Sequence, residues 1–392
     1  VPVTVYEAAG HAGGRCRSFH DATLNRTIDN GNHLVLSGNR AVFDYMTAIG
    51  AVDRVTVGAP VIPFLDLATG LRWAVRPDAG RIPWSWLSAA RRVPGTSFAD
   101  YWRSRKLMNA RDDQAVGQVI PTEGPLWSRF WAPVIVAVMN TPPAEAAAGP
   151  MGRVVRETLA VGAAACRPVL FDDGLDAALV APAVAFIEAG GGEVRTNARV
   201  RGLRFDGDRV DGLTVGADML DLEPADAVIS ALSPSGSAQL LPTIEAPVHF
   251  SPIVNGHFRL ATVDNAVPPV VGLVGGTADW LFRRGDVVSV TVSAADDLAD
   301  APAEAVAHAL WADVAAVYGL DPAAPAPSRI IKEKRATFRQ TPADMRRRPG
   351  SRTRWRNLAL AGDWTDTGLP ATIEGAVRSG DRAAADVLDI VR

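Results

Sequence analysis

The chain has 392 residues, of which 48% are hydrophobic, and a formal net charge of -3. A chain of this length buries a substantial core and usually divides into two domains. The small net charge gives no reason to expect nucleic acid as a partner, because that usually needs a strongly basic face. The two cysteines, Cys16 and Cys166, argue against a disulfide framework and against a metal site built from cysteines, and they fit a reducing, cytoplasmic setting.

The ends of the chain and its apolar runs carry no sign of a membrane span. No stretch approaches the roughly 18 apolar residues of a spanning helix. Residues 1–7 predict a strand, so we expect no signal peptide. Because the sequence starts without Met and inside a structural element, we expect it to be N-terminally incomplete.

The predicted elements alternate between strands and helices along the chain. Alternating, β-branched residues predict a strand over 1–6. Helical patterns follow over 40–55 and 140–190, the latter with a turn near 171–174, and strand-like runs lie over 60–75. Later strands are predicted over 190–215 with a hairpin turn at Asp206-Gly207-Asp208, and over 227–231, 253–260, 287–292 and 357–362. Helices are predicted over 302–318 and 373–391.

Two features near the N-terminus are typical of dinucleotide binding. Glu7 directly follows the first predicted strand, where a carboxylate accepts both hydroxyls of an adenosine ribose. In Gly13-Gly14-Arg15 the glycines allow the backbone to approach a phosphate, and the arginine neutralises it. A solvated turn with a surface arginine is the alternative interpretation of the same residues.

The C-terminal segment LALAGDWTDTGLPATIEGA predicts the other half of such a site. A buried strand leads to Gly362-Asp363, and a helix begins near Thr372. The free N–H groups and the dipole of a helix N-terminus favour negative charge, such as that on the pyrimidine edge of a reduced flavin. Asp363 is then placed to accept a hydrogen bond from a ribityl hydroxyl.

Together these segments resemble the flavin-containing amine oxidase and phytoene desaturase superfamily. The phrase GDWTDTGLPATIEGAVRSG, with FWAPVIVAVMNTPP and KEKRATF, is similar to its hydroxysqualene dehydroxylase, or squalene-associated FAD-dependent desaturase, branch. The resemblance covers nearly the whole chain. It implies an α/β fold, in which a glutathione-reductase-like, Rossmann-type FAD-binding domain joins an α+β substrate domain with a mixed sheet and helices.

The same resemblance implies how the chain divides between the two domains. Residues 1–60, 166–245 and 351–392 would build the FAD-binding domain, and residues 61–165 and 246–350 the substrate domain. Family members begin with a strand and a Gly-x-Gly-x-x-Gly loop just before the position of Val1, and that loop binds the FAD pyrophosphate. Its absence keeps a flavin-free binding protein open as an alternative.

Further cofactor contacts are carried over from the family to matching positions. Val200 would contact the adenine through its backbone, and Ala231 would line the same cleft. Thr372 and Ile373 would meet the flavin pyrimidine ring. Neither cysteine lies in the C-terminal flavin loop, so the resemblance implies FAD without a cysteinyl bond.

The resemblance implies reduction of hydroxysqualene to squalene and water, as a step of hopanoid biosynthesis. The flavin supplies the redox step, and an acid is needed beside the leaving oxygen. The candidates are Asp366 in the flavin loop and Asn255 and His257 on a strand that could cross the flavin face. A carotenoid-type desaturase and an amine oxidase, which use FAD oxidatively, are the rival activities.

An almost wholly hydrocarbon substrate requires a long apolar tunnel. The candidate lining residues, which would equally suit an ordinary core, are Phe130, Trp131, Val134, Met139 and Asn140. Residues 76–131 are rich in tryptophan and arginine, which favour the membrane interface and anionic headgroups. A peripheral position on the inner membrane face is therefore predicted, with a solvated basic face as the alternative.

Overall fold

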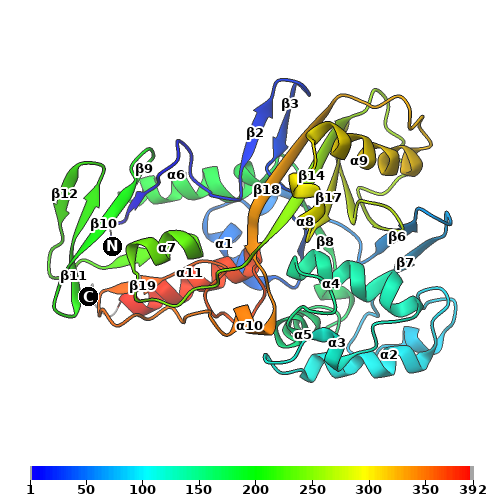
Figure 1. Ribbon diagram of the computed structural model, residues 1–392, viewed down its shortest axis with the longest axis horizontal. Helices are drawn as coiled ribbons and strands as arrows, with labels where there is room; N and C mark the ends of the chain where they lie inside the picture. Colours follow the sequence, from blue (N-terminus) through cyan, green and yellow to red (C-terminus); the bar gives the residue numbers. More distant parts are fainter. Residues whose placement is uncertain (1, 389–392) are drawn as a thin grey trace.

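The computed structural model describes residues 2–388. The chain forms an elongated molecule in which the parallel strand pairs and an antiparallel meander lie at one end, and a large sheet with two groups of helices lies at the other (Figure 1). The first and last described residues both lie at the end that holds the meander.

The dinucleotide-type part contains two short parallel pairs, β1 (Thr4–Tyr6) with β9 (Glu193–Arg195) and β13 (Val228–Ser230) with β19 (Leu358–Leu360). The meander beside them contains β10 (Val200–Asp206), β11 (Arg209–Val215) and β12 (Asp218–Asp221). The helices of this part are α1 (Arg40–Ala48), α6 (Ala181–Ala189), α7 (Pro234–Leu240) and α11 (Ile373–Leu388). It also contains a small sheet of β4 (Val35–Leu36), β8 (Pro168–Phe171) and β5 (Val55–Val57). The hairpin of β2 (Ser18–Asp21) and β3 (Arg26–Asp29) packs against the large sheet, where Leu24 and Ile28 contact Val287.

A seven-stranded sheet dominates the other part. Its strands in spatial order are β18 (Ser328–Phe338), β14 (Phe250–Arg259), β17 (Val287–Ser293), β16 (Trp280–Arg284), β15 (Val270–Val274), β6 (Ile62–Asp66) and β7 (Arg72–Val75). They come from the two chain segments expected to form the substrate domain. Because side chains alternate along a strand, the sheet has two unlike faces. Val254, Phe258 and Val290 pack against α9 (Ala303–Tyr318) in the largest core cluster.

The remaining helices pack on the opposite side of this sheet or connect its ends. They are α2 (Phe98–Ser104), α3 (Val116–Val119), α4 (Ala132–Met139), α5 (Ala148–Glu157), α8 (Asp296–Asp300) and α10 (Pro342–Met345). Phe64 stacks on Trp73 and meets Trp280 edge-on, each at 5.5 Å between ring centroids. These aromatic rings form one wall of a second core cluster that includes α4. No helix of residues 2–388 is long and apolar enough to cross a membrane.

Most predicted elements are confirmed, including the hairpin at 206–208 and the strand before Gly362. Two predictions are wrong. The helix predicted over 40–55 ends at Ala48, because Gly50 takes a φ of +69° and the chain then forms β5. The helical prediction over 140–190 missed β8, a strand stabilised by pairing with β4 and β5 more than 100 residues away. The predicted helix over 373–391 is observed to Leu388, and residues 389–391 lie outside the described residues.

Candidate functional site

Glu7 lies at the carboxyl end of β1, where the chain turns away from the parallel pair. Its Oε1 accepts a hydrogen bond from the Ala9 N–H at 2.7 Å. Its backbone carbonyl accepts from the Ala198 N–H at 2.8 Å, which brings Glu7 beside the start of β10 at Val200. Oε2 of Glu7 accepts no hydrogen bond from residues 2–388, so one carboxylate oxygen remains for a ligand hydroxyl.

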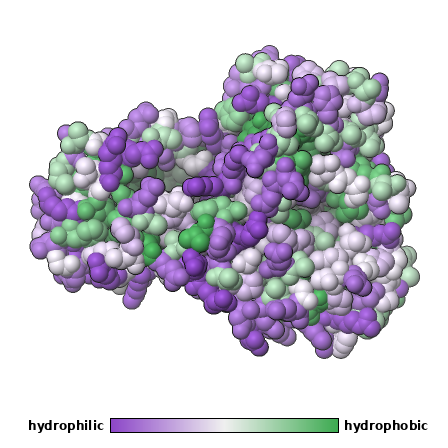
Figure 2. Space-filling model, in the orientation of Figure 1, coloured by the Kyte–Doolittle hydropathy of each residue, from purple (hydrophilic) through white to green (hydrophobic). Residues whose placement is uncertain are grey.

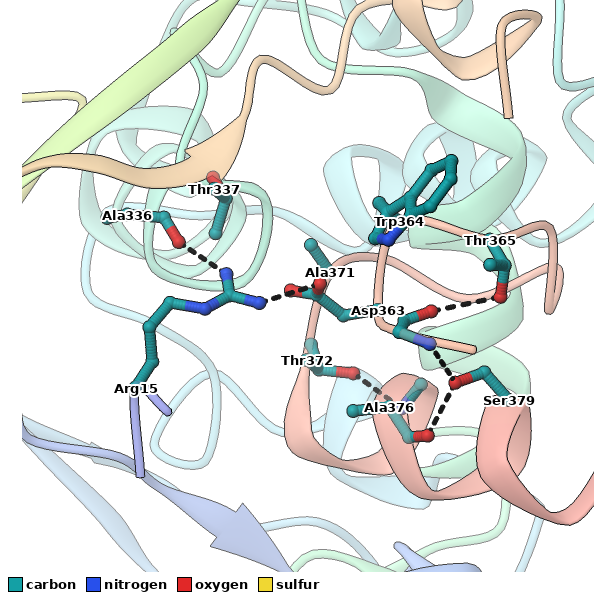
Figure 3. Close-up of polar contacts among 12 residues, drawn as sticks. Arg15, Ala336, Thr337, Asp363, Trp364, Thr365, Ala371, Thr372, Ala376 and Ser379 are labelled. Atoms are coloured by element: carbon teal, nitrogen blue, oxygen red, sulfur yellow. Dashed lines mark hydrogen bonds and ion pairs between the residues drawn. The ribbon is translucent and has the colours of Figure 1, made fainter. Parts of the chain in front are cut away.

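The glycines that follow form a turn that requires glycine at its first position. Gly13 has a φ of +98°, and a Cβ atom there would lie 2.6 Å from both the Cys16 carbonyl and a Val180 methyl. Gly14 has a φ of +58° but open space around it. After this turn, the Arg15 side chain points toward Asp363 and Ala336 (Figure 3).

Arg15 bridges the two ends of the chain (Figure 3). Its Nη2 donates to Asp363 Oδ1 at 2.7 Å, and its Nη1 donates to the Ala336 carbonyl at 2.5 Å. The Asp363 charge raises the pKa of the Arg15 guanidinium above its ordinary value. The Asp363 side chain is 8% exposed, whereas that of Arg15 is 45% exposed, so the carboxylate is enclosed and the guanidinium side chain reaches the surface.

Asp363 is held at the carboxyl ends of two adjacent parallel strands. The Ala361 N–H donates to the Ser230 carbonyl at 2.9 Å, which places Ala231 beside Gly362. Gly362 has a φ of +128°, and a Cβ atom there would lie 2.8 Å from the Trp364 ring. In open parallel sheets, ligands bind at this edge.

The N-terminus of α11 begins the next wall of the site, beside Asp363 in Figure 3. Thr372 Oγ1 accepts from the Gly375 N–H at 3.1 Å and caps the helix. The N–H groups of Thr372, Ile373 and Glu374 donate to no other residue among 2–388. They are free donors at the positive end of a helix dipole, as the pyrimidine edge of a flavin requires.

The Glu374 side chain was not singled out from the sequence. It is buried, and its oxygens accept from the N–H groups of Ala41 and Val42 at 3.2 and 3.0 Å. Glu374 therefore caps the N-terminus of α1 from the first turn of α11. The Arg378 Nε donates to the same carboxylate at 2.8 Å, and this pair anchors the helix behind the site.

A patch of buried polar side chains occupies the face of the seven-stranded sheet opposite α9. Asn255 Oδ1 accepts from Thr291 Oγ1 at 2.8 Å, and His257 Nδ1 lies 2.7 Å from Ser289 Oγ. Two nitrogens of the patch have no partner among the described residues. They are Asn255 Nδ2 and His257 Nε2, and Nε2 is fully buried. Burial lowers the pKa of His257 to about 4, so the ring is neutral at physiological pH.

A loop that sequence analysis overlooked joins this patch to the flavin-type site. The Asn32 side chain donates to Thr291 Oγ1 at 3.1 Å. The pKa of His33 is lowered, mainly by burial and also by the nearby Arg15 charge. Asp29 and Asp363 partly oppose this shift. The signal was the polar run Asp-Asn-Gly-Asn-His at 29–33, which begins at the last residue of β3.

Asp366 lies at the surface, whereas a catalytic acid beside the flavin is expected to be enclosed. It is exposed, and its Oδ1 accepts from the Gly368 N–H at 3.0 Å, so it closes a turn of the loop. The Arg382 guanidinium binds its backbone carbonyl at 2.8 Å. This geometry is that of a loop cap.

The residues expected to line a tunnel lie in the core cluster next to the aromatic wall. Phe130 and Trp131 are buried and meet edge-on at 4.9 Å between centroids, and Met139 is fully buried. Val134 is partly buried against the same cluster. Asn140 is a structural residue, because its Nδ2 donates to the Ser251 carbonyl and Thr337 Oγ1, and its Oδ1 accepts from the Ala294 N–H.

Comparison with known proteins identifies the relatives of this arrangement. The model of the family described as flavin containing amine oxidoreductase matches residues 1–388. Hydroxysqualene dehydroxylase of Sinorhizobium fredii is 46% identical over 386 residues, which are 98% of this chain and 92% of that protein. The same-named protein of Rhodopseudomonas palustris is 45% identical, with the same two shares covered.

Solved structures show the same fold at much lower identity. Cyclohexylamine oxidase from Brevibacterium oxydans superposes with a TM-score of 0.70 at 14% identity, covering 100% of this chain and 94% of that one. A putrescine oxidase bound to putrescine gives a TM-score of 0.66 at 14% identity, covering 99% and 93%. At such identities the likeness concerns the fold alone.

The described residues fit FAD. A free carboxylate oxygen stands at the sugar position, a positive-φ glycine turn and Arg15 follow it, and a helix with free N–H groups faces Asp363. These are the features that hold a ribose, a phosphate and a flavin ring, respectively. The chain belongs to the family of flavin-containing amine oxidoreductases and is an FAD-dependent oxidoreductase.

Proposed function

We propose that this protein reduces hydroxysqualene to squalene. The observation that carries the proposal is the identity of 46% with a hydroxysqualene dehydroxylase over 98% of the chain. In this reaction an allylic C–O bond breaks, the oxygen leaves as water after it takes up a proton, and the carbon receives a hydride. Reduced FAD, when bound, would supply that hydride and release one proton, which balances the proton taken up by the leaving oxygen.

The sheet face beside the site suits a substrate with one polar group on a long hydrocarbon. Asn255 and His257 offer two nitrogens without partners, and both lie on the face of the sheet that also carries Trp280 and Phe282 on the neighbouring strand β16. The polar patch would bind the substrate hydroxyl, and the aromatic wall would pack against the substrate hydrocarbon. A buried donor without a partner carries a desolvation penalty, and a hydrogen bond to a ligand oxygen would offset that penalty.

We assign the donor role at the hydroxyl to the neutral ring of His257. If Ser289 Oγ donates to Nδ1, the proton resides on Nε2, which then donates toward the substrate oxygen. Asn255 Nδ2 provides a second donor and fixes the orientation of the C–O bond. The two donors would hold the leaving oxygen at the polar patch. The 30–33 loop joins this patch to the flavin-type site.

Product analysis tests the reaction. The FAD-loaded protein is incubated anaerobically with hydroxysqualene and a chemical reductant, and the extract is analysed by gas chromatography with mass detection. Squalene is the expected product. Desaturation of a carotenoid precursor or oxidation of an amine, with hydroxysqualene left untouched, would assign the chain to a rival activity.

Substrate delivery from a membrane is the second part of the proposal. The residues Ile82, Trp84 and Leu87 on the turn at 82–87 are 59%, 62% and 66% exposed. Phe98 and Trp102 on α2 are 41% and 49% exposed, and Arg105 lies 3.4 Å from the Trp102 ring centroid. This docking surface combines exposed apolar side chains with cations, as an anionic lipid surface requires.

Not all tryptophans of this segment belong to the docking surface. Trp86 packs against Tyr101 at 5.3 Å between centroids, and Trp131 is buried in the core. Arg92 donates to the Trp86 carbonyl at 3.0 Å. Variants of Trp86 or Arg92 would therefore disturb folding, and they are unsuitable for a binding test.

Vesicle co-sedimentation tests the docking surface. Trp84→Ser with Leu87→Ser should reduce, severalfold, the fraction bound to phosphatidylcholine vesicles that contain phosphatidylserine. Phe186→Ser is the matched control, since Phe186 is 56% exposed on α6. Equal binding by the double variant and the unmodified protein would exclude this surface as the contact.

A further inference from the structure

An arginine-lined cavity lies outside the flavin-type site. It has a volume of about 330 Å³ and lies between segments 243–245 and 346–355. Its arginines are Arg346, Arg347, Arg348, Arg352 and Arg354. Figure 2 shows hydrophilic side chains over the region of α10, which immediately precedes this segment.

Positive charge is in excess in this arginine cavity. Arg347 faces Glu245 at 3.8 Å, and Arg352 Nε binds Asp386 at 2.7 Å. Arg346 and Arg354 have no carboxylate of residues 2–388 within 4.0 Å. The Arg354 guanidinium lies over the Trp355 ring at 4.4 Å from its centroid, which holds it at the cavity wall.

The cavity shares a wall with the loop that carries Asp363. Arg348 donates to the backbone carbonyl of Leu369 at 2.8 Å and to that of Asp363 at 3.3 Å. The Asp366 N–H donates to the Pro349 carbonyl at 2.8 Å. Burial lowers the pKa of Arg348 to about 10, because the enclosed cation is poorly solvated. Its guanidinium donates to the backbone carbonyls of Asp363, Trp364, Thr365 and Leu369, so Arg348 forms the wall between the cavity and the loop.

We propose that the arginine cavity binds the diphosphate group of a small molecule. Planar guanidinium groups form paired hydrogen bonds with phosphate oxygens. Five arginines line this cavity, and Arg346 and Arg354 have no carboxylate of residues 2–388 within 4.0 Å. The volume falls at the lower end of the range of about 300–1,000 Å³ for small-molecule sites. A nucleoside diphosphate and an isoprenoid diphosphate both carry the required group. This binding activity goes beyond the reaction proposed above.

Isothermal titration calorimetry of the FAD-loaded protein at about 0.15 M salt tests the proposal. The probes are inorganic pyrophosphate, adenosine diphosphate and farnesyl diphosphate. Binding of pyrophosphate is expected, and tighter binding of one ester identifies the source of the diphosphate. Arg346→Ala with Arg354→Ala should weaken the binding at least about tenfold, because two charge-assisted contacts are lost.

Two controls make the outcome decisive. Both substituted arginines are exposed, so an unchanged thermal midpoint will show that the double variant is folded. Arg201→Ala, on an exposed position of β10, should leave binding unchanged. The proposal is overturned if none of the probes binds at about 1 mM. It is also overturned if the double variant binds them as tightly as the unmodified protein.

Discussion

Arg15 and Asp363 form an ion pair at 2.7 Å, although 348 positions separate them in the sequence. The pair joins the glycine turn after β1 to the loop after β19. We propose that the FAD site is built from the two ends of the chain, and that each end contributes different groups to it.

Loss of this pair should weaken FAD binding. Arg15→Ala removes a cation beside the expected phosphate position, and contacts to charged groups contribute about 1.5–3 kcal/mol. The dissociation constant of FAD should therefore rise by roughly tenfold to a hundredfold. Quenching of flavin fluorescence on binding measures it. Arg204→Ala, which breaks exposed pairs with Asp211 and Asp221, is the control and should leave FAD affinity unchanged.

Gly13→Ala should destabilise the fold, whereas Gly14→Ala should have a smaller effect. Both positions have positive φ, which costs an alanine about 1 kcal/mol or more. Only at Gly13 would the new methyl group also clash with Cys16 and Val180. The difference between the thermal unfolding midpoints of the two variants measures the effect of the clash. Equal midpoints would show that the turn relaxes to accept the methyl group.

Thr372→Ala should cost roughly 1 kcal/mol of stability, because it removes the side-chain cap of α11. Thr372→Ser keeps the hydroxyl and should restore most of the loss. Urea unfolding gives the free energies. A serine variant as unstable as the alanine variant would mean that the methyl group, and not the cap, stabilises this position.

Asp279 should give the stability a pH dependence. It accepts from the Ser293 N–H at 2.7 Å, and burial raises its pKa to about 7. The folded state therefore holds a proton that the unfolded state releases near its ordinary value of 3.8, so stability is lost as pH rises from about 4 to about 7.

Asp279→Asn, which mimics the protonated form, tests that dependence. Its stability relative to the unmodified protein should increase over this pH range and level off above pH 7. The two proteins are compared at the same pH, because His257 has the opposite effect in both of them. Its pKa is lowered in the folded state, so it destabilises the fold as pH falls below about 6.5. A difference that stays constant with pH would contradict a protonated Asp279.

His257→Phe and Asn255→Ala should lower kcat for hydroxysqualene by about tenfold to a hundredfold, since each removes one donor at the proposed hydroxyl site. His257→Gln keeps a donor on a similar stem and should retain more activity than the phenylalanine variant. FAD content, read from the visible spectrum, should remain unchanged. Full activity of both variants with normal FAD content would remove these residues from the mechanism.

The sequence motifs that predict a flavin-type site are local. A strand that ends in Glu7, glycines that need positive φ, and a strand–loop–helix around Asp363 are each readable within about 20 residues. Their mutual placement required the structure, since the Arg15–Asp363 contact depends on the whole fold.

Long-range pairing explains what the sequence did not reveal. Strand β8 is short and depends on two distant strands, and the contacts of Asn32 become meaningful only when Thr291 is brought beside it. The contact made by Asp366 was also not evident from the sequence. Its position beside the flavin loop suggested an acid, but the structure uses it to close a turn.

A single-turnover experiment tests the central claim most directly. The FAD-loaded protein, reduced with dithionite and freed of excess reductant, is mixed anaerobically with hydroxysqualene while flavin absorbance is followed. The account predicts reoxidation of the flavin together with one squalene for each flavin oxidised. Persistent reduced flavin with intact hydroxysqualene would contradict it.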